Sequence, residues 1–420
     1  MAGPSLHFFR KADWLDRPRL RAYAAIFLSV LALVAIGWLL KSHGLIDPAG
    51  HPIGTDFLNV YAAGLMANAG HPADIYDWAK HGAVEQGVIA YNGYFGWHYP
   101  PMFLFLAVLL ARLAYVPALI VYLVLTFAAY LAAMGRIGLS LPNRFLFAAA
   151  LPAVFVNLGH GQNGFLTTAL AAGGLALLTT RPIAAGLLLG LLAYKPQFAV
   201  LIPVALMAGG YWRTIASAAA TALFSILVSY LVFGAETWFA FFHSLEPTRT
   251  IILEQGATGW QKIVSTFSAV RMWGGSIDLA YGVQTIVTLA AVVLIGLVWW
   301  RCTRPRVAIG MLALAIPLTT PYVLDYDLVI SGVAVFALAA EGRETGFQPW
   351  EKFSLALVAI APLIARGLGS SLHVPIVPPI LIASLAIYTR RAFGRGRCDI
   401  SHFPERDGEK CDRFSPSISL

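Results

Sequence analysis

Apolar stretches of helical length fill most of this chain, and short polar segments separate them. A bilayer core about 30 Å thick needs about 20 apolar residues for each helical crossing, and a helix satisfies its own backbone hydrogen bonds in lipid. Lys and Arg at alternate ends of the stretches orient them by the positive-inside rule. The pattern predicts an all-α polytopic membrane protein with about 12 transmembrane helices and both ends in the cytoplasm. We expect the spans at about residues 23–40, 102–134, 145–158, 165–180, 182–194, 198–209, 215–233, 279–300, 307–318, 324–340, 353–367 and 375–388.

Two places in the apolar pattern leave the helix arrangement open. The stretches 182–194 and 198–209 are shorter than a bilayer crossing, and their small residues predict tilted or half-depth helices that pack against neighbours. The stretch 102–134 contains Arg112 and Pro117, so it is either two helices with a tight turn or one span that follows a half-helix. Basic residues after this stretch belong inside, which favours a single crossing.

The polar segments predict one membrane domain with two large exterior loops. Residues 1–21 carry five basic side chains and are expected in the cytoplasm, ahead of a membrane domain at 22–392. Exterior loops are expected at about 42–101 and 234–278. Basic residues are scarce in the first loop, and the alternation of spans places the second loop outside. The polar tail 393–420 is rich in Gly, Ser and Pro, so we expect it to be disordered and cytoplasmic.

The composition supports a membrane protein and argues against other classes. Hydrophobic residues make up 58% and charged residues 12% of the 420 residues, whereas soluble domains carry about 25% charge. The net charge of +8 comes mainly from basic residues at the ends of apolar stretches, so nucleic acid is not an expected partner. The three cysteines form no close pair typical of a zinc or redox site. The motifs of ATP-binding loops, zinc proteases and serine hydrolases do not occur.

The first exterior loop collects polar, titratable and aromatic residues, and Asp56 is its strongest candidate for chemistry. Apolar spacing near 3.6 residues predicts short interfacial helices at 57–68 and 73–88. Asp56 comes directly before the first of these helices. Its carboxylate is therefore either a helix cap or a catalytic group.

Further along the same loop, polar and aromatic residues occur in two groups. Asp74 and Asp77 flank Tyr76, where they either form a solvated turn before a helix or contact a substrate. His98 and Tyr99 precede two prolines that begin a helix, and both suit the membrane interface. His98 is therefore a candidate for substrate binding rather than for catalysis.

Polar residues also interrupt the apolar sequence at the expected outer ends of later spans, and such costly residues indicate function. His160, Gln162 and Asn163 either bind a phosphate or sugar or form hydrogen bonds between helices. The ammonium of Lys195 either neutralises a phosphate leaving group or extends to the interface.

The last polar group stands where an expected span begins. Either Asp325 or Asp327 supports a sugar hydroxyl, or both of them cap that helix. The expected topology places them on the same exterior face as the loop residues. The other candidates for substrate contact on this face are Tyr61, Gln197, Lys262 and Tyr322.

Motifs across about residues 50–210 are Thr55-Asp56-Phe57 with Tyr61 and Ala63-Gly64, Ile75-Tyr76-Asp77, Tyr99-Pro100-Pro101, Gly161-Gln162-Asn163, and 185–190 leading to Lys195-Pro196. In this order they resemble the bacterial C-type membrane glycosyltransferases, specifically glycosyltransferase family 87, which includes polyprenol-phosphate-mannose-dependent mannosyltransferases. Where Ser-Pro followed by His is expected near an outer helix end, this chain has Thr320-Pro321-Tyr322 and then Asp325-Tyr326. The departure leaves open the sugar and any histidine role.

The resemblance implies a C-type glycosyltransferase architecture with a large periplasmic first loop and an active site on the periplasmic face of the inner membrane. It implies a polyprenyl-phosphate donor of a mannose-like hexose and a lipid or glycan acceptor, without a nucleotide sugar, a cofactor or a metal. Asp56 would be the general base that removes the acceptor hydroxyl proton, with inversion at the anomeric carbon. Lys195 and His160 would bind the phosphate.

Two other function classes fit a polytopic membrane protein. A secondary transporter or flippase of lipid-linked sugars would place ionisable residues at mid-membrane, on broken helices in related halves. The polar residues of this chain instead lie toward one expected face, and the sequence contains no twofold repeat. A structural subunit of an envelope-glycan complex would lack activity alone and would co-purify with partners. Glycosyl transfer is the function that the sequence favours.

Overall fold

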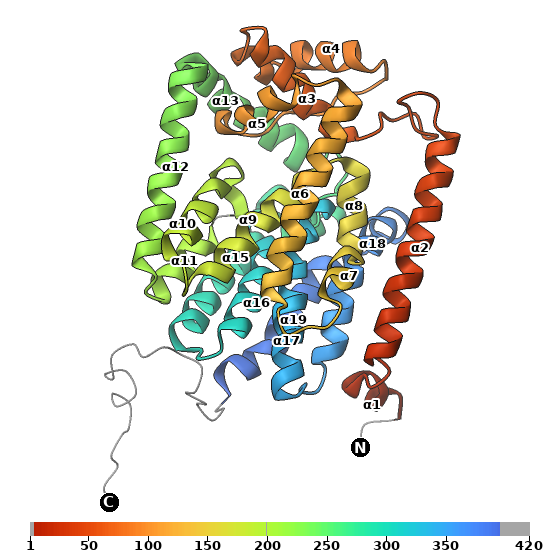
Figure 1. Cartoon of the computed structure of the whole chain (residues 1–420), viewed down its shortest axis with the longest axis vertical. Coiled ribbons are helices and arrows are strands. Elements are labelled where there is room, and N and C mark those ends of the chain that lie inside the picture. The colour runs from red at the N-terminus through yellow and green to blue at the C-terminus, as the bar shows by residue number, and fades with distance from the viewer. Residues whose placement is uncertain (1–3, 199, 395–420) are drawn as a thin grey trace, which may run out of the picture.

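The computed structural model describes residues 4–198 and 200–394. This part of the chain is all-α, with 76% of it helical and no strand, which confirms the predicted fold class. Figure 1 shows a bundle of steeply inclined helices and a layer of shorter helices at one end. The tail that was predicted to be disordered lies outside the described residues from residue 395 onward.

Short helices form the layer at the top of Figure 1, which we call the cap layer. It comprises α3 (Thr55–Asn68), α4 (Trp78–Val88), α5 (Leu104–Leu110) and α13 (Ala235–Pro247). The two short helices predicted in the first loop are confirmed as α3 and as a 3₁₀ turn followed by α4. Most residues of α3 are buried, so this loop packs onto the bundle rather than extending away from it.

Five of the described helices are long and apolar enough to cross a bilayer, namely α2 (Arg17–Lys41), α6 (Tyr115–Ile137), α12 (Trp212–Phe233), α15 (Ile277–Arg301) and α18 (Glu351–Leu372). The other predicted spans contain shorter helices, which are α8 (Pro152–His160), α9 (Gly164–Leu177), α10 (Pro182–Leu191), α11 (Leu201–Ala208), α16 (Pro305–Ala315), α17 (Ser331–Thr345) and α19 (Val377–Phe393). The remaining helices are α1 (Pro4–Lys11), α7 (Arg144–Ala149) and α14 (Thr266–Met272). A membrane-type helical bundle is confirmed, and the count of 12 crossings stays a prediction.

The stretch 102–134 consists of a half-helix followed by one long helix. The half-helix α5 has only seven residues, and the chain turns before α6 begins at Tyr115. Pro117 lies in the first turn of α6, where its missing backbone donor costs no helical hydrogen bond. The structure therefore selects the second of the two arrangements that the sequence left open.

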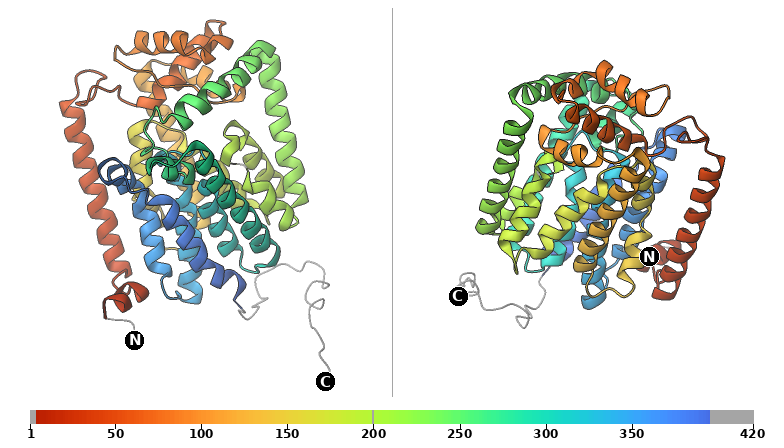
Figure 2. Two further views of the ribbon diagram at one scale, coloured as in Figure 1. Left: turned by 180° about the vertical axis from the view of Figure 1, so that it is seen from behind. Right: turned by 45° about the horizontal axis from the view of Figure 1, so that its top comes forward.

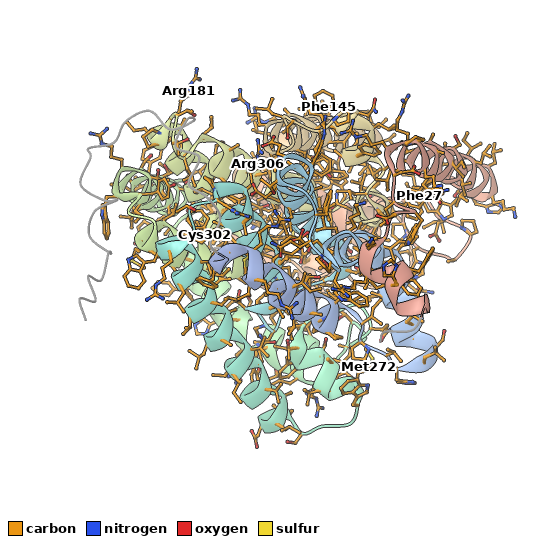
Figure 3. All side chains as sticks on the ribbon, turned by 90° about the horizontal axis from the view of Figure 1, so that it is seen from below. Phe27, Phe145, Arg181, Met272, Cys302 and Arg306 are labelled. Atoms are coloured by element: carbon orange, nitrogen blue, oxygen red, sulfur yellow. The ribbon has the colours of Figure 1, made fainter. Side chains whose placement is uncertain are left out.

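Basic residues lie at helix ends opposite the cap layer. Arg136 lies in the last turn of α6 and Arg301 in the last turn of α15. Helix α1 lies at this end of the molecule in Figure 1. Figure 3 is seen from this end and shows Arg181 projecting from the rim of the bundle. The charge asymmetry agrees with the predicted orientation, although the two sides of the membrane stay a prediction.

Helix α4 carries a buried carboxyl–imidazole pair. His81 and Glu85 are both 0% exposed, and His81 Nε2 lies 3.6 Å from Glu85 Oε1. His81 Nδ1 lies 3.0 Å from the Ile75 carbonyl, which only accepts, so Nδ1 carries the ring proton. Glu85 Oε2 accepts from Tyr91 Oη at 2.6 Å and from the Phe95 amide at 3.0 Å. Burial lowers the pKa of His81 to about 4 and raises the pKa of Glu85 to about 7. Burial therefore favours the neutral forms of both Glu85 and His81.

The substitution Glu85→Gln is expected to stabilise the protein at pH 8 by roughly 2–3 kcal/mol. The folded-state pKa of Glu85 lies above its ordinary value of 4.5, so its neutral form is favoured in the fold. The stability that comes from the neutral Glu85 side chain is fully present below about pH 4.5 and is lost as the pH rises through about 7. Gln cannot ionise, so it keeps that stability at about pH 8. Thermal unfolding in detergent at pH 5 and pH 8 measures the difference. The exposed Glu246→Gln change is the matched control, and destabilisation by Glu85→Gln at pH 8 would contradict the assignment.

Candidate active site

Asp56 lies in the first turn of α3, at the junction between the cap layer and the bundle. The N-cap of α3 is Gly54, which has a φ of 75° and no side chain to cap the helix. The cap interpretation of Asp56 is therefore wrong. The carboxylate instead accepts a hydrogen bond at Oδ2 from Gln162 Nε2 at 3.0 Å. No described residue donates a hydrogen bond to Oδ1, which leaves that oxygen available to a substrate hydroxyl.

The Gln162 side chain contacts Asp56, two tyrosine hydroxyls and the backbone amide of the next residue. Its Oε1 accepts from the Asn163 amide at 2.9 Å and from Tyr99 Oη at 3.1 Å. Because a backbone amide only donates, the side-chain oxygen must face Asn163 and the side-chain nitrogen must face Asp56. That nitrogen also donates to Tyr326 Oη at 3.1 Å. The Gln162 amide therefore presents a fixed donor to the Asp56 carboxylate.

The turn between α8 and α9 can carry Gln162 to Asp56 because Gly161 has no side chain. Gly161 ends α8 with a φ of 62°, in the left-handed region that favours glycine. A Cβ atom at this position would lie 2.8 Å from Phe57 Cβ and 3.3 Å from Gly54 Cα. Any larger residue would push this turn away from the start of α3. Glycine at position 161 is therefore required by the close approach of the α8–α9 turn to the start of α3.

His160 links the residue before Asp56 to helix α18. Its Nδ1 lies 3.0 Å from Thr55 Oγ1, and its Nε2 lies 2.8 Å from Arg366 Nη2. A guanidinium only donates, so Nε2 accepts and Nδ1 carries the proton that Thr55 receives. Arg366 also donates from Nε to Asp325 Oδ2 at 2.7 Å. His160 is thus a neutral positioning group, and both ring nitrogens already have partners.

Lys195 is buried and paired. Its Nζ donates to Asn163 Oδ1 at 2.9 Å and forms an ion pair with Asp327. Lys195 is 4% exposed and Asp327 is 3% exposed, so this ammonium does not extend to the interface. Asp327 also accepts from the Leu324 amide at 3.1 Å, which ties the pair to the start of a 3₁₀ turn. The charge of Lys195 is therefore neutralised within the protein.

Lys262 is a half-buried cation on the second long loop, and its ammonium has no partner among the described residues. Its backbone carbonyl accepts from the Asp325 amide at 3.1 Å, and the next residue forms an isolated bridge with Leu324. These contacts hold Lys262 beside the 322–327 segment. Its charge acts on Asp56, which makes it a cation that is both near the carboxylate and free to bind an anion.

The electrostatic environment of Asp56 suits a base. Burial raises the pKa of its carboxyl above the ordinary value of 3.8. The Gln162 hydrogen bond opposes that rise, and so do nearby cations, which are Lys262, Arg366 and Lys195. A carboxylate that is partly desolvated and yet held in place accepts a proton more readily than one in water.

Two acidic candidates have structural roles in the cap layer. Asp77 caps α4, because its Oδ1 accepts from the Ala79 amide at 3.0 Å and the Lys80 amide at 3.1 Å. Asp74 forms an exposed ion pair with Lys80 at 2.7 Å. The structure gives neither carboxylate a contact with Asp56, and the alternative of a solvated turn before a helix describes this segment.

Two tyrosine candidates donate hydrogen bonds to backbone carbonyls near the site. Tyr61 Oη donates to the Leu113 carbonyl at 2.8 Å, where it holds α3 against the turn after α5. Tyr76 Oη donates to the Tyr99 carbonyl at 2.9 Å. Tyr76 therefore positions the backbone of a residue whose hydroxyl contacts Gln162.

Three further candidates make no direct contact with Asp56 within the described residues. His98 Nδ1 lies 3.0 Å from Thr248 Oγ1, and burial lowers the pKa of His98 to about 4, so its ring is neutral. The Tyr322 ring packs edge-on against His98, with 6.3 Å between ring centroids. Within the described residues, the side chain of Gln197 makes no hydrogen bond.

Sequence reasoning missed Tyr326 and Arg366 as site residues. Arg366 lies in the apolar stretch 353–367, where an isolated charge is costly and is itself a signal of function. Tyr326 had no such signal, because a tyrosine near a membrane interface is common. Among residues 4–198 and 200–394, no three His, Cys, Asp or Glu side chains are grouped as ligands for a metal.

The comparison with protein families covers much of this site. A model described as glycosyltransferase family 87 matches residues 97–321, which is 225 of 420 residues. The chain belongs to glycosyltransferase family 87. It is therefore a transferase of sugars, and its apolar helices identify it as a membrane protein. No curated protein and no solved structure matches the chain.

The region matched to family 87 includes Gln162, Lys195 and Lys262, which come from the bundle and from the second loop. Asp56 precedes it, and Asp325 and Arg366 follow it. The candidate roles of these three residues in this family 87 enzyme rest on their contacts in the folded chain.

Proposed function

We propose that this family 87 glycosyltransferase moves a mannose-like hexose from a polyprenyl-phosphate donor to a lipid or glycan hydroxyl. The reaction would occur at the cap-layer end of the molecule, on the outer face of the inner membrane. The observation that carries the proposal is the Asp56 carboxylate, which Gln162 holds at one oxygen and leaves open at the other. Membrane lipids surround the apolar helices, and the site accepts both substrates from the bilayer surface.

In the proposed reaction Asp56 acts as the general base. Its Oδ1 takes the proton of the acceptor hydroxyl as that oxygen attacks the anomeric carbon of the donor. The bond between the anomeric carbon and the phosphate oxygen breaks, and polyprenyl phosphate leaves with the electron pair. Attack from the face opposite the phosphate inverts the anomeric centre. Gln162 keeps the carboxylate aimed while Tyr99 and Tyr326 hold the amide.

We assign the donor phosphate to Lys262 rather than to Lys195 or His160. Lys262 is near Asp56 and is unpaired among the described residues. Lys195 already neutralises Asp327, and the ring nitrogens of His160 are occupied. A charge-assisted hydrogen bond from an ammonium stabilises the developing phosphate charge.

A transfer assay with purified full-length protein in proteoliposomes tests this function. The donors are polyprenyl-phosphate mannose, polyprenyl-phosphate glucose and GDP-mannose, the acceptor is an alkyl mannoside, and mass spectrometry identifies the product. We expect transfer from a lipid-linked donor alone. Transfer from GDP-mannose would overturn the donor assignment. Movement of the lipid-linked sugar across the bilayer without transfer, under every acceptor supplied, would indicate the flippase alternative.

In the same assay, Lys262→Gln is expected to raise the KM for the lipid-linked donor about tenfold, because one charge-assisted contact to phosphate is lost. Lys80→Gln removes the same charge from an exposed ion pair in the cap layer and is expected to leave KM unchanged. Equal KM values for wild type and Lys262→Gln would place the phosphate on another residue.

A further inference from the structure

Helix α2 stands apart from the rest of the molecule. Figure 1 and both views in Figure 2 show it beside the bundle rather than within it. Of 18 consecutive apolar residues in this helix, only 6% are buried within the protein. Its 25 residues are long enough to cross a bilayer. Lipid must therefore cover nearly the whole of this helix.

A cavity of about 600 Å³ separates the first turns of α2 from α7. That volume lies within the range of about 300–1,000 Å³ that is typical of ligand sites. Arg17 and Arg21 line it from α2, one helical turn apart, and Asn143 lines it from the other side. The rest of the lining is apolar and includes Ala25 and Phe147.

The two arginines in this cavity are unneutralised. Neither guanidinium has a hydrogen-bond or ion-pair partner among the described residues. Arg19, between them in sequence, pairs with Asp16 at 3.6 Å and does not line the cavity. The cavity therefore combines two free positive charges with an apolar lining from α2 and from the 142–147 segment. Basic pockets between membrane helices recognise anionic lipid head groups by this combination.

We propose that this cavity binds an anionic phospholipid, which links α2 to the bundle. The lipid phosphate lies between Arg17 and Arg21, and its acyl chains run along α2 in the space that the protein leaves open. Charge complementarity favours an anionic lipid over a zwitterionic one, because the two arginines repel the ammonium group of a zwitterionic lipid. The site lies at the α1 end, opposite the cap layer, so the inference is independent of the proposed transfer reaction.

Native mass spectrometry of the full-length protein, titrated with phosphatidylglycerol or with phosphatidylcholine of the same chains, tests the site. We expect tight binding of one phosphatidylglycerol, and about 30-fold weaker binding in Arg17→Gln/Arg21→Gln, which is the effect of two lost charges near a membrane surface. Arg19→Gln removes an equal charge from the same helix turn and is expected to change affinity less than about twofold.

Three outcomes would overturn the proposal. Equal affinity for phosphatidylcholine would remove the requirement for an anionic lipid. A loss of affinity in Arg19→Gln as large as that of a single Arg17→Gln or Arg21→Gln variant would indicate general charge attraction. Full affinity in the double variant would place the lipid elsewhere. Circular dichroism and thermal unfolding of each variant confirm that α2 and the bundle remain folded.

Discussion

Asp56→Asn is expected to lower the rate of glycosyl transfer about 10²- to 10⁴-fold, the usual contribution of a general base. Asparagine keeps an oxygen that accepts from Gln162, so the fold and the α8–α9 turn are expected to remain intact. Single-turnover transfer in proteoliposomes measures the loss, and unchanged thermal unfolding shows that the protein is folded. Wild-type activity in Asp56→Asn would refute the base assignment.

The matched control is Asp77→Asn, which changes the same functional group in the same cap layer. Asp77 caps α4, and asparagine caps a helix about as well as aspartate, so the substitution is expected to change stability by less than about 1 kcal/mol and to leave the rate of transfer unchanged. The pH profile gives a second readout. Burial raises the pKa of Asp56. As the medium becomes acidic, wild-type activity is therefore expected to fall at a higher pH than it would with an exposed aspartate as the base. This acid limb reports protonation of the base.

Asp327→Asn is expected to destabilise the protein by about 3–5 kcal/mol, because it leaves the Lys195 ammonium buried without its counter-charge. Asparagine can still accept from the Leu324 amide, so the loss measures the ion pair rather than the turn. Thermal unfolding in detergent measures the change. Asp74→Asn breaks an exposed ion pair and is expected to cost less than about 1 kcal/mol.

The double variant Lys195→Met/Asp327→Asn separates a structural role of Lys195 from phosphate binding. Removing both charges is expected to restore at least half of the lost stability, because no buried charge then lacks a partner. If Lys195 only neutralises Asp327, the double variant transfers sugar with a donor KM close to that of wild type. A KM raised as strongly as in Lys262→Gln would return Lys195 to the phosphate site.

The apolar pattern predicted the helices well because burial in lipid or protein selects the same residues. The breaks at 42–101 and 234–278 and the short helices in the first loop all follow from local sequence. The number of crossings did not follow, because helices such as α8 and α10 are too short to be assigned by length alone. Their depth in the bilayer depends on the neighbours that surround them.

Within the candidate site, the sequence indicated which residues were unusual but not what they contact. Asp56, Gln162 and Lys195 stood out because polar groups are costly beside apolar helices. Lys195 looked like a free cation, yet it lies against Asp327, 132 residues away. Arg366 was overlooked inside an apolar stretch, although it orders His160.

The sequence by itself determined that this protein is a helical membrane protein with a polar first loop that carries Asp56, because hydropathy and charge position act locally. The tertiary structure alone decided which groups have partners. It showed that Gly54, not Asp56, caps α3, that Lys195 is neutralised, and that Lys262 is free among the described residues. Hydrogen bonds and ion pairs between distant segments depend on how the helices pack, and no local pattern encodes that packing.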